Sequence, residues 1–543
     1  MTNTHSAIDP IRVEVISSAL RSLVQEVGST LVRAAFSTNI KERRDGTAAV
    51  FDKDGLIVAQ DELGSTLHLG TLIGIIAEIR RRYPEDRIED GDVFIGNDPY
   101  RGGGSHLPDI VLATPIFVDG KIHAWVANAA HHADYADRGH KHIFQEGLRI
   151  APVKFAQRGV VQEDLLELIL VNCQVPSERV PDLHAQMAAN ALGRVRYLEL
   201  AERFGADTLS AATAALMDYT ERRMRAAIRE LPDGTYHSED VFDFPGLAQP
   251  LDLNLTLTID GDELFFEFDG PDQVPMGINV VWTALYATVY YSVLTVTDPD
   301  IIPNAGLHRP VHIKAREGSV LNAVEPAAVF QRSHTCQRIV DLVHRAIADA
   351  APHRVTAASN GANTGAMFSG LNPRTGRYFV YMESFGGGSG ARYNKDGLDG
   401  IQVHITNTSN LPVEALESEY PLLIERYELV DDSGGAGEFR GGMGILRRVR
   451  ALTADVHVQW DTTRVTSRPW GLFGGQEGAA GHCDINGLED PIAAGEADLD
   501  VDDVVSIYTS GAGGYGEPAA RREEDVERDR REGRFTTWPS DQS

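Results

Sequence analysis

Six histidines lie close together in this sequence and are its first sign of chemistry. They make up a third of the 18 histidines and fall between residues 106 and 142: His106, His123, His131, His132, His140 and His142. Imidazole is the commonest metal ligand in proteins and the usual proton carrier near neutral pH. Any one of these histidines alone would be interpreted as a buried polar residue with satisfied hydrogen bonds. Together they predict a metal site or a catalytic site.

The surrounding sequence predicts a β-hairpin that brings these residues together. Apolar, β-prone segments flank Asp119-Gly120, which suits the two-residue turn of an antiparallel pair over residues 110–127. If the turn closes there, Asp109 pairs with Ala130, which is next to His131. We therefore expect a carboxylate and an imidazole at one end of the hairpin.

Two imidazoles and one carboxylate are a common ligand set for Fe(II) and also suit Mn or Zn. His106 lies in the loop that leads into the same strand end, so the predicted metal ligands are His106, Asp109 and His131. A metal held in this way can polarise a carbonyl group and acidify bound water. Asp134 is a further carboxylate within reach, as an outer partner or an extra ligand.

The rest of the chain predicts an α+β fold, with a helical and hairpin N-terminal half and a β-rich, glycine-rich C-terminal half. Asp9-Pro10 is a typical helix start, and apolar residues then recur every three or four positions up to Leu31. Further helices are expected within residues 69–82, 163–230 and 335–350, and a hairpin at 251–269. We expect a metal-bearing region at residues 1–240, a β-rich region at 241–518 and a charged tail at 519–543.

Composition and charge exclude several classes of protein. Of 543 residues, 50 are Lys or Arg and 79 are Asp or Glu, for a formal charge of −29, which disfavours nucleic acid and anionic membranes as partners. The apolar residues 280–297 include threonines and tyrosines, which favours a buried helix over a membrane span. No signal-peptide pattern opens the sequence. The three cysteines are far apart, which excludes a disulfide scaffold and predicts a cytoplasmic protein: Cys173, Cys336 and Cys483.

Nucleotide-binding motifs are absent or out of context. Gly511-Ala-Gly-Gly-Tyr-Gly516 fits the dinucleotide pattern GxGxxG, but only 27 residues follow it, too few for the returning strand that such a site needs. The chain has no GxxxxGK(S/T) phosphate loop and no GxSxG nucleophile elbow. We therefore expect no ATP site on this chain and interpret the glycines as a tight turn at a sheet edge.

Longer strings carry a resemblance to a known family. They include Ser37-Thr-Asn-Ile-Lys-Glu-Arg-Arg-Asp45, His68-Leu-Gly70, Asn97-Asp-Pro-Tyr100, Gly104-Ser-His-Leu-Pro-Asp109, Ala130-His-His-Ala-Asp134 and Phe144-Gln-Glu-Gly147. From Asp9 to Pro518 the chain resembles the hydantoinase B/oxoprolinase family. That family includes the B-type component of N-methylhydantoinase, the C-terminal part of ATP-dependent 5-oxoprolinase, and a subunit of acetone and acetophenone carboxylases.

The resemblance implies a division of labour. A partner subunit of the hydantoinase A type, with an actin-like ATPase fold, would bind ATP and activate the substrate by phosphorylation. The B-type chain would carry a divalent metal and complete the reaction. The family's metal ligands carry over onto His106, Asp109 and His131. Asp45 matches a polar residue of that site, and we add His132 and Glu146 as candidate catalytic residues because they are near in sequence. His334 departs from the family strings, and we assign it no role.

The resulting prediction is a B-type subunit of an ATP-dependent hydrolase that opens a hydantoin, a lactam or 5-oxoproline. Amide resonance protects such rings from water, so phosphorylation of the carbonyl oxygen in the partner would create a leaving group. The metal would then polarise the intermediate or supply hydroxide, with Asp45 or His132 as general base. Three alternatives stay open: a ketone carboxylase subunit, a structural partner of the ATPase without a metal, and a free-standing metallohydrolase.

Overall fold

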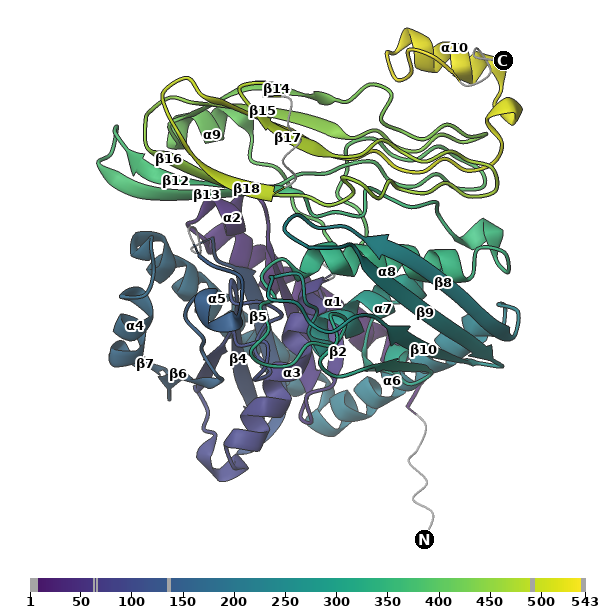
Figure 1. Cartoon of the computed structure of the whole chain (residues 1–543). Helices are drawn as coiled ribbons and strands as arrows, with labels where there is room; N and C mark the ends of the chain where they lie inside the picture. Colours follow the sequence, from purple (N-terminus) through teal and green to yellow (C-terminus); the bar gives the residue numbers. More distant parts are fainter. Residues whose placement is uncertain (1–7, 62–63, 65–66, 134–137, 489–493, 539–543) are drawn as a thin grey trace.

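The computed structural model describes residues 8–61, 64, 67–133, 138–488 and 494–538 (Figure 1). It confirms the predicted α+β class, since long helices stand beside several antiparallel sheets. Figure 1 shows two layers: the helices and strands up to β11 lie below, and the strands from β12 onward lie above. Asp134, expected near the metal, lies outside the described residues.

A seven-stranded sheet forms the centre of the N-terminal half, in the order β2-β1-β5-β4-β3-β6-β7. Its strands are β1 (Gly46–Asp52), β2 (Ile57–Gln60), β3 (Val93–Gly96), β4 (Asp109–Val118), β5 (Lys121–His131), β6 (Val153–Gln157) and β7 (Val160–Val161). Helices α1 (Pro10–Ala34) and α5 (Pro176–Phe204) pack on one face, and α3 (Leu67–Arg82) packs on the other. Because both faces are covered, β4 is buried without interruption from Asp109 to Ile116 and β5 from Ala124 to His131, mostly as apolar residues.

The β4–β5 hairpin differs from the predicted register by one residue. The pairing follows the prediction next to the turn, but it shifts at Ile116 and leaves His123 as an extra, bulged residue in β5. Asp109 therefore pairs with His131, and the predicted pairing of Asp109 with Ala130 is wrong. Directly opposed residues of an antiparallel pair share one face of the sheet, so the bulge puts the carboxylate and the imidazole on the same side.

The predicted helices are present, with ends that differ by a few residues. Asp9 caps α1, and its Oδ1 accepts a hydrogen bond from Ile11 N at 3.2 Å. The apolar stretch after residue 280 is a buried helix, α7, as predicted. None of the described helices is long and apolar enough to cross a membrane. The remaining helices are α2 (Thr38–Lys41), α4 (Glu163–Leu170), α6 (Ala206–Ile228), α7 (Trp282–Val296), α8 (Arg332–Ala346), α9 (Val413–Glu419) and α10 (Glu523–Arg531).

A second sheet has the order β11-β10-β9-β8 and includes the predicted hairpin. Its strands are β8 (Gly234–Phe242), β9 (Leu251–Asp260), β10 (Glu263–Asp269) and β11 (Val311–Ala315). Apolar residues alternate along β9 and pack against α7 and α8 in one hydrophobic cluster. The expected boundary between residues 240 and 241 lies inside β8, and this cluster contains residues from both sides of it, such as Met224 and Leu342.

Two four-stranded sheets form the upper layer and enclose a third core, with orders β13-β12-β16-β18 and β14-β15-β19-β17. The strands are β12 (Gly365–Asn372), β13 (Arg377–Ser384), β14 (Leu422–Leu429), β15 (Ile445–Ala451), β16 (Val456–Asp461), β17 (His482–Ile485), β18 (Ala494–Leu499) and β19 (Val504–Tyr508). Beside them, extended glycine-rich segments pack backbone to backbone. A Cβ at Gly390 would lie 1.7 Å from Ala357 O, and one at Gly511 would lie 1.8 Å from Ser433 O. Glycine is required there by close approach of main chains.

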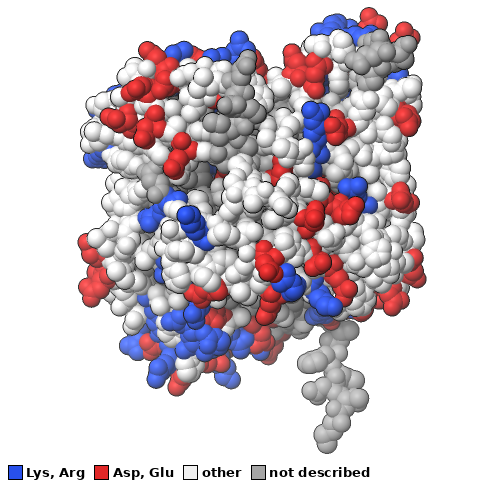
Figure 2. All heavy atoms as spheres, in the orientation of Figure 1, with Lys and Arg blue, Asp and Glu red and all other residues white. Residues whose placement is uncertain are grey.

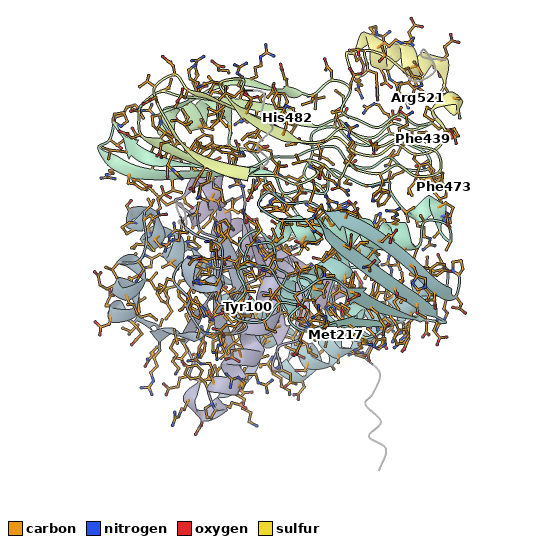
Figure 3. All side chains as sticks on the ribbon, viewed as in Figure 1. Tyr100, Met217, Phe439, Phe473, His482 and Arg521 are labelled. Atoms are coloured by element: carbon orange, nitrogen blue, oxygen red, sulfur yellow. The ribbon has the colours of Figure 1, made fainter. Side chains whose placement is uncertain are left out.

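The charged C-terminal segment, as far as residue 538, is docked on the rest of the chain. Arg521, marked in Figure 3, bonds Asp396 at 2.7 Å and Asp529 at 2.6 Å, and Asp529 is fully buried. Figure 2 shows acidic and basic side chains interspersed over one face of the molecule, with Lys and Arg most numerous at the lower left.

Candidate metal centre

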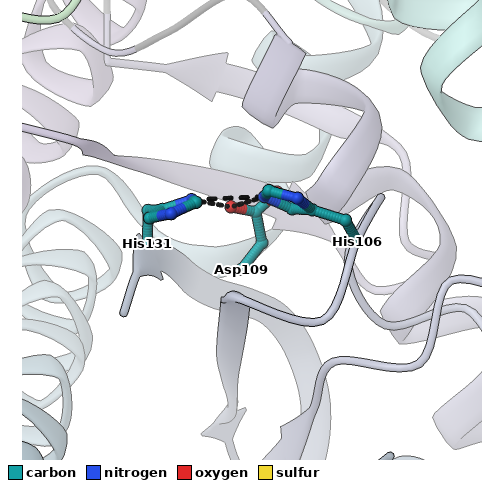
Figure 4. A group of neighbouring side chains, drawn as sticks. All are labelled: His106, Asp109 and His131. Atoms are coloured by element: carbon teal, nitrogen blue, oxygen red, sulfur yellow. Dashed lines mark hydrogen bonds and ion pairs between the residues drawn. The ribbon is translucent and has the colours of Figure 1, made fainter. Parts of the chain in front are cut away.

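The three predicted metal ligands converge in the structure (Figure 4). His106 Nε2 and His131 Nδ1 lie 3.1 and 3.2 Å from Asp109 Oδ1, and the two nitrogens are 3.2 Å apart. Within the described part of the chain, no other group of histidine, cysteine and acidic side chains has ligand spacing of this kind. Ligand atoms bound at about 2.1 Å to one ion lie about 3.0–3.4 Å apart at octahedral or tetrahedral angles. The three measured distances fit such an ion.

The hydrogen bonds around His106 also favour a cation. The Phe330 carbonyl oxygen lies 3.1 Å from His106 Nδ1 and can only accept, so Nδ1 carries the hydrogen and Nε2 offers a lone pair to Asp109. Burial and the nearby Arg332 lower the pKa of His106 to about 3, which keeps its ring neutral. His106 Nε2 and Asp109 Oδ1 are then both acceptors, and at 3.1 Å from each other they need a cation or a proton between them.

The fold explains why the ligands meet. Asp109 opens β4 and His131 ends β5, so the hairpin presents them from opposed strands. His106 comes from the loop between β3 and β4. Tyr100, in the same loop, donates its hydroxyl hydrogen to Ala327 O at 2.7 Å and ties the loop to the segment before α8 (Figure 3). That segment also supplies the carbonyl group that orients the His106 ring.

A second set of groups holds the other oxygen of Asp109. Asp109 Oδ2 accepts hydrogen bonds from Arg332 Nη2 at 3.1 Å, Thr71 Oγ1 at 3.2 Å and Ser105 Oγ at 3.3 Å. Burial works to raise the pKa of Asp109, but the charge of the neighbouring His68 and the hydrogen bond with His131 outweigh burial and hold this pKa well below its ordinary value. Asp109 is therefore a carboxylate with one oxygen anchored and the other directed at the histidines.

His68, at the start of α3, is a site residue to which sequence reasoning gave no role. Its Nε2 lies 3.4 Å from Asp109 Oδ1 and 3.5 Å from Asp45 Oδ1. Burial works to lower the pKa of His68, but the two carboxylates outweigh it and raise this pKa above its ordinary value. The family string His68-Leu-Gly70 was the only sequence signal for it. Asp45, by contrast, was expected near the metal and lies at the entrance to β1, where its carbonyl accepts from His131 N at 3.0 Å.

The other two expected catalytic residues lie outside this group. His132 points to the opposite face of the hairpin, where its Nε2 lies 3.0 Å from Gln186 Oε1 of α5 and its Nδ1 contacts Arg179. Burial and Arg179 hold the pKa of His132 well below its ordinary value. Glu146 is buried behind the segment before α8, and its Oε1 accepts from two backbone N–H groups there.

A cavity of about 990 Å³ opens over the ligands. His106, His131, His68 and Asp45 line its floor, whereas residues of β12, β13, β16 and β18 line its opposite wall. His334, to which the sequence gave no role, also lines it. The site is thus a buried ligand set at the bottom of a space large enough for a small organic molecule.

The comparisons with known proteins agree with this picture. The chain matches the family model described as hydantoinase B/oxoprolinase over residues 9–518. It is 32% identical to the B-type component of a putative D-/L-hydantoinase of Pseudomonas sp. (strain NS671), over 97% of this chain and 93% of that protein. It is 31% identical to 5-oxoprolinase 1 of Arabidopsis thaliana over 94% of this chain, but it spans only 42% of that longer protein.

Two solved structures share the fold. The ATP-dependent caprolactamase from Pseudomonas jessenii superposes with a TM-score of 0.88 and 29% identity, over 97% of this chain and 94% of that one. Acetone carboxylase in its nucleotide-free form superposes with a TM-score of 0.87 at 18% identity, over 97% of this chain and 78% of that one, which shows a common fold. With the sequence matches over nearly its whole length, the chain belongs to the hydantoinase B/oxoprolinase family.

Proposed function

We propose that this chain is the B-type subunit of an ATP-dependent cyclic amide hydrolase that opens a hydantoin, lactam or 5-oxoproline ring. The observation that carries the proposal is the buried cluster of His106, Asp109 and His131 at the floor of a cavity. The relatives named as a hydantoinase component and an ATP-dependent caprolactamase support the reaction class. ATP binds to a partner ATPase subunit of the hydantoinase A type, because this chain has no phosphate loop, and the complex works in the cytoplasm.

The residues of the site have distinct roles in this proposal. His106, Asp109 and His131 hold a divalent ion, either Mn, Zn or Fe. When bound, such an ion would act as a Lewis acid toward the carbonyl group of the substrate and would lower the pKa of water. Asp45 lines the cavity and accepts the proton of the attacking water as general base. His68 lies between Asp45 and Asp109 and keeps both carboxylates in place.

Positioning roles fit the two candidates outside the cavity. His132 fastens the end of β5 to α5 through Gln186, and so fixes the backbone next to His131. Glu146 holds the N–H groups of the segment whose carbonyl group orients His106. Neither side chain lines the cavity, so the general base in this mechanism is Asp45.

The experiment is to purify the chain in complex with its ATPase partner and to measure ATP hydrolysis and ring opening with hydantoin, caprolactam and 5-oxoproline. We expect the wild-type complex to open at least one ring in an ATP-dependent reaction. The His106→Ala variant should lose ring opening but still form the complex with the ATPase partner. His312→Ala is the matched control, because His312 is exposed on the second sheet, with 46% of its side chain accessible. Full ring opening by His106→Ala, or after removal of metal by a chelator, would refute the metal role.

A ketone carboxylase subunit is the second candidate, favoured by the fold shared with acetone carboxylase. It predicts bicarbonate-dependent consumption of a ketone and no ring opening in the same complex. A purely structural partner of the ATPase predicts no bound metal in elemental analysis. A free-standing metallohydrolase predicts ring opening by the isolated chain without ATP.

A further inference from the structure

Asp461 is a carboxylate of the cavity to which the mechanism above assigns no role. It is the last residue of β16, in which Val456, Val458 and Trp460 are buried in the third core. Because the side chains of a strand alternate between its two faces, Asp461 lies on the other face, toward the cavity that it lines. The strand pattern therefore directs an acidic side chain into the space over the metal ligands.

Two side chains at the start of α8 fix the orientation of this carboxylate. Gln331 Nε2 donates to Asp461 Oδ2 at 2.7 Å, and His334 Nε2 lies 3.3 Å from Asp461 Oδ1. The backbone N–H of Asn363 donates to His334 Nδ1 at 3.1 Å, so the ring hydrogen of His334 is on Nε2, which faces Asp461. His334 is buried, which holds its ring in place. Each oxygen of Asp461 thus has one donor that fixes it.

The carboxylate of Asp461 keeps accepting capacity toward the cavity. A carboxylate oxygen accepts up to two hydrogen bonds, and 20% of this side chain is accessible. In the part of the chain that the structure describes, no lysine or arginine forms an ion pair with Asp461, and this includes Lys141, which lines the same cavity. Gly365, opposite Asp461 on β12, has no side chain, and even an added Cβ would stay 3.7 Å from Asp461 Oδ1. A ligand in the cavity can therefore approach this oxygen.

The other acidic side chains of the lining are placed differently. Glu383 pairs with Arg447 at 3.2 Å and accepts from Leu411 N at 3.1 Å. Glu496 is exposed to solvent. Asp45 lies beside the metal ligands and serves as the base in the proposed mechanism. Asp461 is thus the carboxylate that a ligand can meet away from the metal ligands and inside the cavity.

Cyclic amides bring the donor that this carboxylate can accept. Hydantoins, lactams and 5-oxoproline all carry a ring N–H next to a carbonyl group. When such a group leaves water for a cavity with many apolar side chains, it loses free energy unless an acceptor replaces the water. Once the carbonyl oxygen is phosphorylated, a ring nitrogen that keeps its hydrogen also carries positive charge. A carboxylate then binds this N–H more strongly than a neutral acceptor would.

We infer that Asp461 binds the substrate by accepting a hydrogen bond from the ring N–H, and so selects rings with a free N–H over rings alkylated at that nitrogen. The inference rests on the proposed function and deepens it, because it adds the residue that orients the ring in the cavity. Gln331 and His334 are positioning residues in this arrangement, since they act through Asp461.

The test uses the complex with the ATPase partner and two pairs of compounds: caprolactam with N-methylcaprolactam, and hydantoin with 3-methylhydantoin. In Asp461→Ala we expect kcat/KM for the N–H compound to fall by about tenfold or more, as for a lost hydrogen bond to a charged group, and kcat/KM for the N-methyl compound to stay close to wild type. Where a compound binds but is not opened, its calorimetric Kd replaces kcat/KM. Asp498→Asn is the matched control, because Asp498 bonds His457 at 2.8 Å, is 85% accessible and lies outside the cavity lining.

An equal loss for both compounds of a pair would assign Asp461 a structural role and overturn the inference. No loss for the N–H compound, or tighter binding of the N-methyl compound by wild type, would overturn it as well. If wild type opens none of the rings, the proposed function fails separately, and the Kd values of the same pairs decide the inference by the same criteria. If Asp461→Ala does not form the complex, Asp461→Asn, which preserves the shape of the side chain, takes its place in the comparison.

Discussion

Replacing Glu146 by glutamine tests how the structure supports the segment that orients His106. Glu146 is completely buried, and its Oε1 accepts hydrogen bonds from Val329 N at 2.7 Å and Phe330 N at 2.8 Å. Burial raises the pKa of this carboxyl group to about 8, although the two N–H donors act in the other direction. Glutamine keeps the accepting oxygen and cannot ionise, so Glu146→Gln removes the titration and keeps the hydrogen bonds.

The sign and size of the effect follow from proton linkage. A carboxyl group whose pKa is raised in the folded state binds its proton more tightly there than in the unfolded chain. Its stabilising contribution is complete below its ordinary pKa of 4.5 and is lost as the pH rises toward its folded pKa of about 8. The difference between these two pKa values corresponds to about 5 kcal/mol of unfolding free energy.

Scanning calorimetry of wild type and Glu146→Gln at several pH values between about 5 and 8 measures this effect. We expect the unfolding temperature of the variant to rise relative to wild type across that range. Glu317→Gln, at an exposed position, should follow wild type at every pH. If the difference between Glu146→Gln and wild type stays constant with pH, Glu146 does not carry a buried, protonated carboxyl group in the folded protein.

Three further predictions concern the site and the glycine-rich layer. His131→Ala should lower the affinity for Mn and Zn by about 100-fold or more, measured by metal titration of dialysed protein, and retention of wild-type affinity would exclude His131 as a ligand. Asp45→Asn should reduce kcat for ring opening by about 10²–10⁴-fold with unchanged metal content, whereas a small effect on kcat would remove Asp45 as the base. Gly390→Ala should lower the unfolding temperature or prevent soluble expression, because its Cβ would lie 1.7 Å from Ala357 O, while Gly376→Asn, at an open turn with φ of 66°, should not. Equal stability of these two glycine variants would contradict the close packing.

The meeting of His106, Asp109 and His131 was predictable because these residues lie on local elements. Strand and turn signals around Asp119-Gly120 place Asp109 near His131, and the resemblance to the family names the same residues. The register was wrong by one residue because a bulge has no clear signal in an apolar strand. The same shift explains why His132, expected near the metal, lies against α5. Patterns of local sequence do not distinguish two adjacent histidines.

Residues brought in by distant helices were not predictable. His68 comes from the start of α3, and Arg332 comes from the start of α8, more than 200 residues after the hairpin's first strand begins. Both reach Asp109 through tertiary packing, since α3 packs on the central sheet, whereas α8 packs against α7 and the second sheet. Neither position stands out by periodicity or spacing, so tertiary packing alone determines their role.

The bulge at His123 determines which side of the sheet each later residue of β5 faces. If His123 were paired in the ladder instead of bulged, even-numbered positions such as Ala130 and His132 would share the side of Asp109, and His131 would face α5. The chemistry of the site therefore depends on how many residues are paired between the turn and His131, and not only on which side chains are present. Deleting the bulged His123 would leave Asp109 opposite His131, whereas deleting one paired residue between the bulge and His131 would bring His132 opposite Asp109.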